Sequence, residues 1–156
     1  MRAEEPSAEQ EDEILVEYHQ FGLRDEEAED SFHSLGVAEE GIRVGPGSAA
    51  FLSDGNDHYA AVRFESWPHE PPLPPPPWDV EEGVDEVIDL PSGVVRLWEL
   101  VGGPSPNAFP VGPPGAYRLR IHVRSFLTAV LNGEVDSDET FGHGAERWLL
   151  RFWPAS

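Results

Sequence analysis

The stretch YRLRIHVR, residues 117–124, alternates apolar and polar side chains without a break. Successive side chains of a β-strand point to opposite faces of the sheet. One face of this stretch would therefore carry tyrosine, leucine, isoleucine and valine, and the other would carry three arginines and a histidine. This pattern predicts a strand whose apolar face packs into a core and whose cationic face points away from it.

The stretch ERWLLRFWP, residues 146–154, has the same period. Its two faces are Trp148, Leu150 and Phe152 on one side and Arg147, Leu149, Arg151 and Trp153 on the other. Half of the ten arginines lie on these two stretches, and neighbouring strands would bring like charges together unless carboxylates lie between them. The arginines would then pair with the surplus acids across the strands, or bind an anion or an acidic patch on a partner.

Further strand-like runs recur along the chain, separated by glycine, proline and aspartate. They are ILVEY (14–18), GIRV (41–44), SAAFL (48–52), HYAAVRFESW (58–67), VDEVIDL (84–90) and VVRLWEL (94–100). The turn SDGND, residues 53–57, predicts that the runs on either side of it pair antiparallel. Helical periodicity is nearly absent, the best candidate being one turn near Ser34–Glu40. We expect an all-β fold, an antiparallel β-sandwich of about eight short strands with long Pro-rich loops.

Two segments differ in composition from these runs. Residues 1–12 are almost all acidic, small or polar, and predict a disordered tail, which leaves 13–156 as a single β-sandwich domain. The stretch PHEPPLPPPPW, residues 68–78, predicts polyproline II structure. It could be a docking ligand for an aromatic groove or a stiff connection between two strands of one domain. We favour the connection, because strand signals continue on both sides.

The charge balance is the most unusual bulk property. The 156 residues include 30 acidic and 10 basic ones, a formal net charge of −20. Such a surface repels nucleic acid and anionic lipid, and it attracts a basic protein and speeds the encounter. It also simply keeps a protein soluble, so both interpretations stay open. No apolar run approaches the ~20 residues of a membrane span, and residues 1–13 lack an apolar signal segment, so we expect a cytoplasmic protein.

No sequence motif indicates catalysis or metal binding. The chain has no cysteine, and its six histidines are not spaced as metal ligands. If the chain were a hydrolase, His19 and His122 would be its best-placed catalytic residues. We keep a hydrolase as a hypothesis beside the two binding functions considered below. The carboxylates of 134–139 are spaced like those of a Ca²⁺ loop but lack the glycine and distal glutamate of an EF-hand. We therefore expect a protein that is not an enzyme and uses no cofactor, metal or small-molecule substrate.

Acidic and apolar residues stand side by side in DVEEGVDEVID, residues 79–89. Such a segment could recognise a basic groove on another protein, or be an ordinary edge strand kept soluble by its charge. From their clustering alone, the candidate partner-binding residues are Glu81, Glu82, Asp85, Glu86 and Asp89.

The stretch VEYHQFGLRD, residues 16–25, reads as a strand that continues into an acidic turn. Alternation then places Tyr18 in the interior, with its hydroxyl at a polar edge. Nothing in the adjacent sequence orients His19 as a general base.

The same residues carry a resemblance. Glu17–Phe21 resembles the opening strand of the competence protein J family, small inhibitors of the bacterial DNA-entry nuclease. Val37–Val44, Tyr59–Phe64 and Pro114–Leu119 match further segments of that family, in order, over roughly residues 13–124. The proline-rich insert at 71–77 and the acidic tail depart from the family.

The resemblance implies a non-catalytic inhibitor of a DNA-degrading enzyme, and the net charge of −20 agrees with it. We expect an acidic binding protein that blocks a basic partner, a nuclease, by occupying its cationic groove. The alternative is a general β-sandwich interaction module recruited through its polyproline loop. The resemblance names no inhibitory residues.

Overall fold

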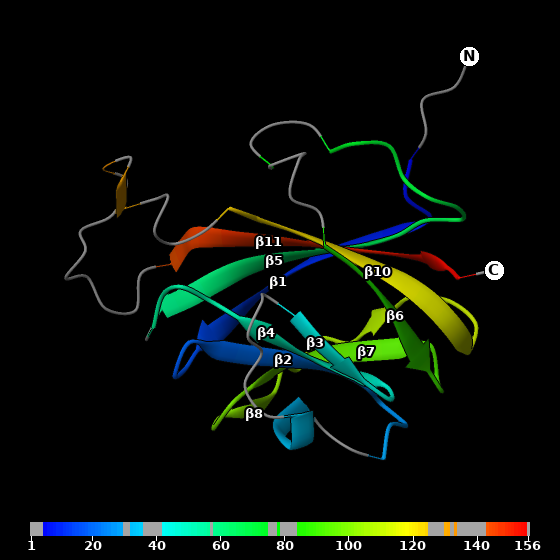
Figure 1. The fold of residues 1–156 in the computed structure, drawn as a ribbon, viewed down its shortest axis with the longest axis horizontal. Coiled ribbons are helices and arrows are strands. Elements are labelled where there is room, and N and C mark those ends of the chain that lie inside the picture. The colour runs from blue at the N-terminus through cyan, green and yellow to red at the C-terminus, as the bar shows by residue number, and fades with distance from the viewer. Residues whose placement is uncertain are drawn as a thin grey trace.

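Two β-sheets packed face to face make up the computed structural model (Figure 1). It describes residues 5–29, 32–35, 42–56, 58–74, 78, 84–124, 130–131, 133 and 143–155. The strands are β1 (Ala8–Val16), β2 (Gln20–Asp25), β3 (Ile42–Gly45), β4 (Ser48–Leu52), β5 (His58–Ser66), β6 (Val84–Leu90), β7 (Val94–Glu99), β8 (Gly103–Pro104), β9 (Phe109–Pro110), β10 (Gly115–Arg124) and β11 (His143–Pro154). A single 3₁₀ turn, η1 (Phe32–Leu35), lies near the predicted helical turn. The predicted all-β sandwich is confirmed.

The five-stranded sheet has the order β1-β5-β11-β10-β6, and the six-stranded sheet has the order β3-β4-β2-β7-β8 with β9 also paired to β7. Neighbouring strands are antiparallel except β5 and β11, which run parallel. The two stretches that carry half of the arginines, β10 and β11, are direct neighbours. β11 therefore lies at the centre of its sheet, between β5 and β10.

The predicted pairing of β4 with β5 is wrong. β4 pairs with β2 and β3, whereas β5 pairs with β1 and β11 in the other sheet. The turn signal at 53–57 correctly marks the end of a strand, but the chain crosses between the sheets there. A turn motif specifies local chain reversal and carries no information about which sheet the next strand joins.

More of the acidic N-terminal segment belongs to a β-strand than we expected. β1 begins at Ala8 and pairs with β5 along its whole length, so residues 8–12 belong to the sheet and not to a disordered tail. Glu9, Glu11 and Glu13 occupy alternate, exposed positions of β1, and Glu9 and Glu11 both contact Arg63 of β5. Alternation and this cross-strand pairing explain why so acidic a segment forms a strand.

The stretch 16–25 is not one continuous strand. Val16 ends β1, Gln20 begins β2, and Tyr18 and His19 form the turn between them. The turn restarts the alternation, so Val16 and Phe21 are buried while Tyr18 is exposed. The predicted inward packing of Tyr18 is therefore wrong.

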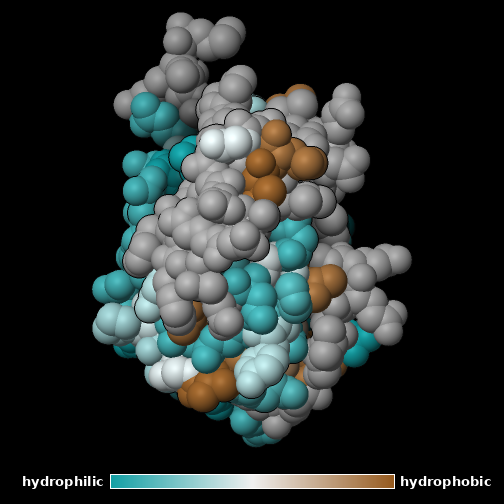
Figure 2. All heavy atoms as spheres, turned by 90° about the vertical axis from the view of Figure 1, so that its left-hand side faces the viewer, coloured by the Kyte–Doolittle hydropathy of each residue, from teal (hydrophilic) through white to brown (hydrophobic). Residues whose placement is uncertain are grey.

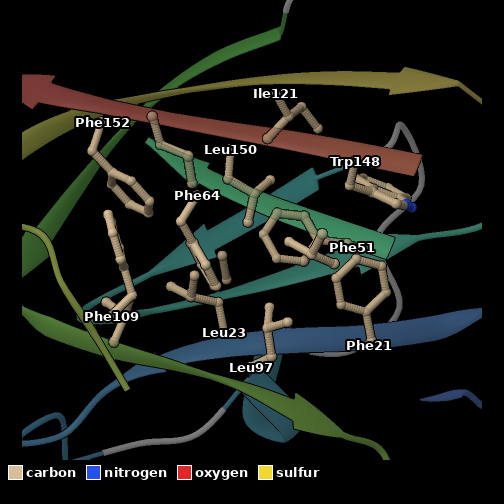
Figure 3. Packing of buried hydrophobic residues seen from close by; sticks show 14 of the residues in the cluster. Phe21, Leu23, Phe51, Phe64, Leu97, Phe109, Ile121, Trp148, Leu150 and Phe152 are labelled. Atoms are coloured by element: carbon tan, nitrogen blue, oxygen red, sulfur yellow. The ribbon is translucent and has the colours of Figure 1, made fainter. Parts of the chain in front are cut away.

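Aromatic side chains from both sheets fill the space between them (Figure 3). The rings of Phe21 and Phe51 from one sheet lie 4.9 and 5.5 Å, respectively, from that of Trp148 in the other. Phe64 of β5 stacks on Phe109 of β9 with centroids 4.9 Å apart. The apolar faces predicted for β10 and β11 belong to this core.

A glycine in β2 makes room for η1 on the outer side of the six-stranded sheet. Phe32 of η1 is buried, and a Cβ atom on Gly22 would lie 2.1 Å from the Phe32 ring. The ring thus packs directly on the backbone of β2, and only glycine allows this approach.

The outer face of the five-stranded sheet places two cations opposite each other. Arg120 of β10 and Arg151 of β11 are register partners. Arg151 Nε donates to Glu65 Oε1 of β5 at 2.9 Å, and Arg120 donates to both carboxylate oxygens of Asp85 of β6 at 2.6 and 2.8 Å. The strands that flank β10 and β11 thus supply the carboxylates, and cross-strand pairing with acids holds for these two arginines.

Glu65 gathers several donors at this face. It also accepts hydrogen bonds from Arg63 Nε and Trp67 Nε1, each at 2.9 Å. Burial by itself raises the pKa of Glu65, but the hydrogen bonds from Arg63, Trp67 and Arg151 outweigh it, so the pKa lies below its usual value. Glu65 is therefore held as the carboxylate at neutral pH.

The described part of the proline-rich segment lies on this same face (Figure 1). Arg151 Nη1 donates to the carbonyl oxygen of Pro72 at 2.5 Å, and Arg120 contacts Glu70 at 3.4 Å. Pro71 and Pro74 are buried. These contacts support the interpretation of residues 68–74 as a connection packed on its own domain.

Replacing Gly22 by alanine should lower the free energy of unfolding by about 1–3 kcal/mol, because the new methyl group would displace the Phe32 ring. Urea unfolding followed by tryptophan fluorescence measures the change. In a Phe32→Ala background the same Gly22→Ala substitution should cost far less, because the ring is absent. An equal loss in both backgrounds would contradict this account.

Replacing Glu65 by glutamine should destabilise the protein by about 2–4 kcal/mol at pH 7, because Arg151 loses its buried carboxylate. The folded-state pKa of Glu65 is lowered, so its stabilisation is present above the ordinary value of ~4.3 and is lost as pH falls through the folded pKa. The difference in unfolding free energy between wild type and Glu65→Gln should therefore shrink from pH 7 to about pH 3. A constant difference over this range would refute the assignment.

Candidate partner-binding surface

The acidic residues predicted to bind a partner lie on or just before the edge strand β6. Glu81 and Glu82 lie outside the described residues. Asp85 is bound by Arg120, and these hydrogen bonds are the main reason why the pKa of Asp85 lies below its usual value. Asp85 therefore already has a cation of its own within the fold.

Glu86 and Asp89 are both exposed but do not share a face. Strand alternation places Asp89 on the side of Asp85, and Glu86 on the other side. The clustering in sequence therefore does not become one continuous acidic surface on β6.

Asp89 instead lies at the same cavity as carboxylates from a distant part of the chain. It lines a cavity of about 490 Å³ together with Glu27 and Glu29 of the loop after β2. Apolar atoms of Ala28 and Leu90 complete the wall. We call this cavity, with Glu27, Glu29 and Asp89, the acidic mouth. The acidic run DEEAED, residues 25–30, is visible in the sequence. Nothing in the sequence, however, predicts that the loop after β2 lies near β6.

A second group of carboxylates lies on the opposite edge strand. Glu9, Glu11 and Glu13 occupy exposed alternate positions of β1. Six of the ten arginines lie on the three strands between the edges, namely Arg63, Arg118, Arg120, Arg124, Arg147 and Arg151. The arginines of the five-stranded sheet thus lie on its middle strands, whereas its carboxylates, apart from Glu65 and Glu146, lie on its two edge strands.

The end of the molecule at which β1 continues into β2 exposes large aromatic and apolar residues. Figure 2 views this end and shows hydrophilic surface interrupted by separate hydrophobic patches. Tyr18 and Val101 are 69% and 71% exposed there. Glu17 joins their two turns, because its Oε1 accepts hydrogen bonds from the backbone N–H of Val101 at 3.0 Å and of Gly102 at 3.4 Å. Sequence reasoning missed this pair because it placed Tyr18 in the core.

One buried polar cluster has the composition of a hydrolase triad. Ser53 Oγ donates to Glu146 Oε2 at 2.7 Å, and His58 Nε2 lies 3.3 Å from Ser53 Oγ. All three residues are buried, and Ser53 Oγ also accepts the N–H of Gly55 at 3.0 Å. Ser53 directly follows β4, so this cluster links the end of β4 in one sheet to β5 and β11 in the other.

Of the two histidines considered for hydrolysis, His19 contacts this cluster only through its backbone carbonyl, which accepts the N–H of Ser53 at 2.8 Å among the hydrogen bonds of the described residues. His19 is exposed in the β1–β2 turn, and His122 is buried on β10. Among the described residues, no three His, Asp or Glu side chains are arranged to hold a metal ion. No helix in the described part of the chain is long and apolar enough to cross a membrane.

Comparison with known proteins gives matches in structure only. No family model and no curated protein sequence matches the chain. The fold is similar to that of ComJ from Bacillus subtilis, described as an inhibitor of the DNA degrading activity of NucA, with a TM-score of 0.62, 15% identity, and coverage of 99% of this chain and 100% of ComJ. It is also similar to the product of crocagin biosynthetic gene J, with a TM-score of 0.59, 15% identity, and coverage of 96% and 99%. The resemblance to the competence protein J family is thus confirmed in its structure, and the chain has the ComJ fold from end to end.

Proposed function

We propose that this chain is a non-catalytic inhibitor that binds a basic enzyme, a nuclease, and blocks its cationic groove. The observation that carries the proposal is the match in fold to an inhibitor of DNA degradation over nearly the whole of both chains. The net charge of −20 is independent support, because a nuclease must present cations to phosphates, and an acidic protein can occupy the same groove.

The distribution of charge favours long-range attraction. Arg63, Arg120 and Arg151 pair with carboxylates of one sheet, among them Glu9 and Asp85 on its edge strands, but 30 acidic residues outnumber the 10 basic ones, so carboxylates remain in excess. The predicted residues Glu86 and Asp89 enter the proposal as part of this excess. Together with Glu81, Glu82 and Asp85 of the same segment, they would add to the field that steers a basic partner.

The polyproline alternative gains no support from the described residues. Pro72 is hydrogen-bonded to Arg151, and Pro71 and Pro74 are buried. A groove on another protein would have to displace these contacts before it could bind the segment. We therefore keep the inhibitor as the proposed function.

The test is inhibition of a panel of purified non-specific DNA endonucleases that includes NucA. Duplex DNA cleavage should fall to zero at a 1:1 ratio of inhibitor to at least one basic nuclease. Raising the ionic strength from about 0.05 to 0.5 M should weaken that inhibition at least ~10-fold, because salt screens exposed charges. Absence of inhibition at stoichiometric excess, or affinity that ignores ionic strength, would refute the proposal.

Two double variants of equal net charge separate local from overall electrostatics. Glu27→Gln with Asp89→Asn removes two charges of the acidic mouth, and Glu5→Gln with Glu86→Gln removes two exposed charges elsewhere. If the acidic mouth steers the partner, the first variant should lower the association rate more than the second. Equal association rates for the two variants would show that net charge alone, and not the position of the carboxylates, speeds association.

A further inference from the structure

The two residues that join β1 to β2 have an unfavourable backbone conformation. Tyr18 and His19 have φ angles of 54° and 64°, in the left-handed region. Backbone hydrogen bonds between Glu17 and Gln20, at 3.0 and 3.2 Å, close this two-residue hairpin. Such turns strongly prefer Asn-Gly, and a bulky residue at positive φ is a genuine outlier.

The Tyr18 side chain buries little surface that could offset this unfavourable conformation. The residue is 69% exposed. An aromatic residue in a strained turn that contributes so little burial is better explained by a role outside the fold, because strain of this kind is concentrated at functional sites.

The turn is nevertheless held firmly in place. Glu17 ties it to the turn at Val101 and Gly102, and the carbonyl of His19 accepts the N–H of Ser53 at 2.8 Å. We call Tyr18, His19, Val101 and Gly102 the tip. A tip fixed from both sides loses little conformational entropy on binding, which favours affinity.

The chemistry of the tip suits the centre of an interface with a basic protein. Its own residues carry no carboxylate, although the chain as a whole has a charge of −20. Carboxylates lie close behind it: Glu17 bonds to the backbone of the tip, and the Glu99 carboxylate lies beside Gly102. A desolvated aromatic anchor surrounded by charged residues is the usual arrangement of an interface hot spot.

We propose that Tyr18 is the anchor residue through which the chain binds its basic protein partner, with Val101 beside it and Glu17 holding both turns. This inference rests on the proposed function, and it names the contact that determines how slowly the complex dissociates. Steering by distant carboxylates and anchoring by the tip are separate contributions, because long-range attraction acts mainly on association and buried contacts act mainly on dissociation.

The double variant Tyr18→Asn with His19→Gly separates binding from folding. Asn-Gly suits the turn, so the melting temperature should rise by roughly 2–5 °C. Inhibition of the nuclease in the panel that wild type inhibits best should weaken at least ~10-fold through faster dissociation. A purely structural role predicts the higher melting temperature with unchanged inhibition, and this result would overturn the proposal.

A photo-crosslinking experiment separates failure of the anchor from failure of the proposed function. The crosslinker p-benzoylphenylalanine is incorporated at residue 18 or, as a matched control, at residue 73 of the full chain in cells that carry the gene. Tyr18 and Leu73 are both 69% exposed, and Leu73 lies in the proline-rich segment. Mass spectrometry identifies the adducts.

A basic nuclease crosslinked through residue 18 and not through residue 73 would support both proposals. A specific adduct of residue 18 with another class of protein would keep the anchor and refute the nuclease. Adducts through residue 73 alone would overturn the anchor and restore the polyproline alternative. Absence of any adduct through residue 18 would likewise overturn the anchor.

Discussion

Two arginines that face each other on adjacent strands constrain the whole five-stranded sheet. Arg120 and Arg151 can be register partners only because Glu65 and Asp85 lie on the strands to either side. Without these carboxylates, like charges would meet at the centre of the sheet. The same guanidinium groups then bind residues 70 and 72, so the long connection after β5 is fastened to the face it crosses. The same two guanidinium groups thus link β10 and β11 to their flanking strands and to the connection after β5.

This arrangement also determines what the molecule presents to others. Arg63, Arg120 and Arg151 pair with carboxylates within this sheet, but the 30 acidic residues of the chain outnumber its 10 basic ones, and Glu27, Glu29 and Asp89 lie together around the acidic mouth. The buried Ser53, His58 and Glu146 are committed to joining strands. What remains for recognition is a negative field and a few exposed groups, which is consistent with a protein that acts by binding.

The sequence predicted the strands far better than their arrangement. Alternation placed the apolar residues of β10 and β11 correctly, because a sheet with one buried face imposes a strict period of two. It failed at Tyr18 and His19, where positive φ angles occur without the glycine or asparagine that normally signal them. It also could not show that the chain changes sheets after Ser53, since pairing partners depend on contacts between residues far apart in the sequence.

The candidate site shows the same limit. Clustering in the sequence grouped Asp85, Glu86 and Asp89, but strand alternation separates Glu86 from the other two, and Arg120 neutralises Asp85. Glu27 and Glu29, which line the same cavity as Asp89, are about sixty residues away from it along the chain. Long-range assembly of this kind leaves no local pattern to read.

The central position of β11 has a consequence for biosynthesis. The parallel β5–β11 pair and the antiparallel β10–β11 pair cannot form until residues 143–154 have left the ribosome, although β5 and β10 emerge much earlier. Until then both strands have one open edge, which invites association between nascent chains. Pairing of β5 with β11 also joins Glu65 to Arg151, 86 positions apart, so formation of this pair must be slow compared with formation of a hairpin. This sheet is therefore completed only once β11 is free to enter it.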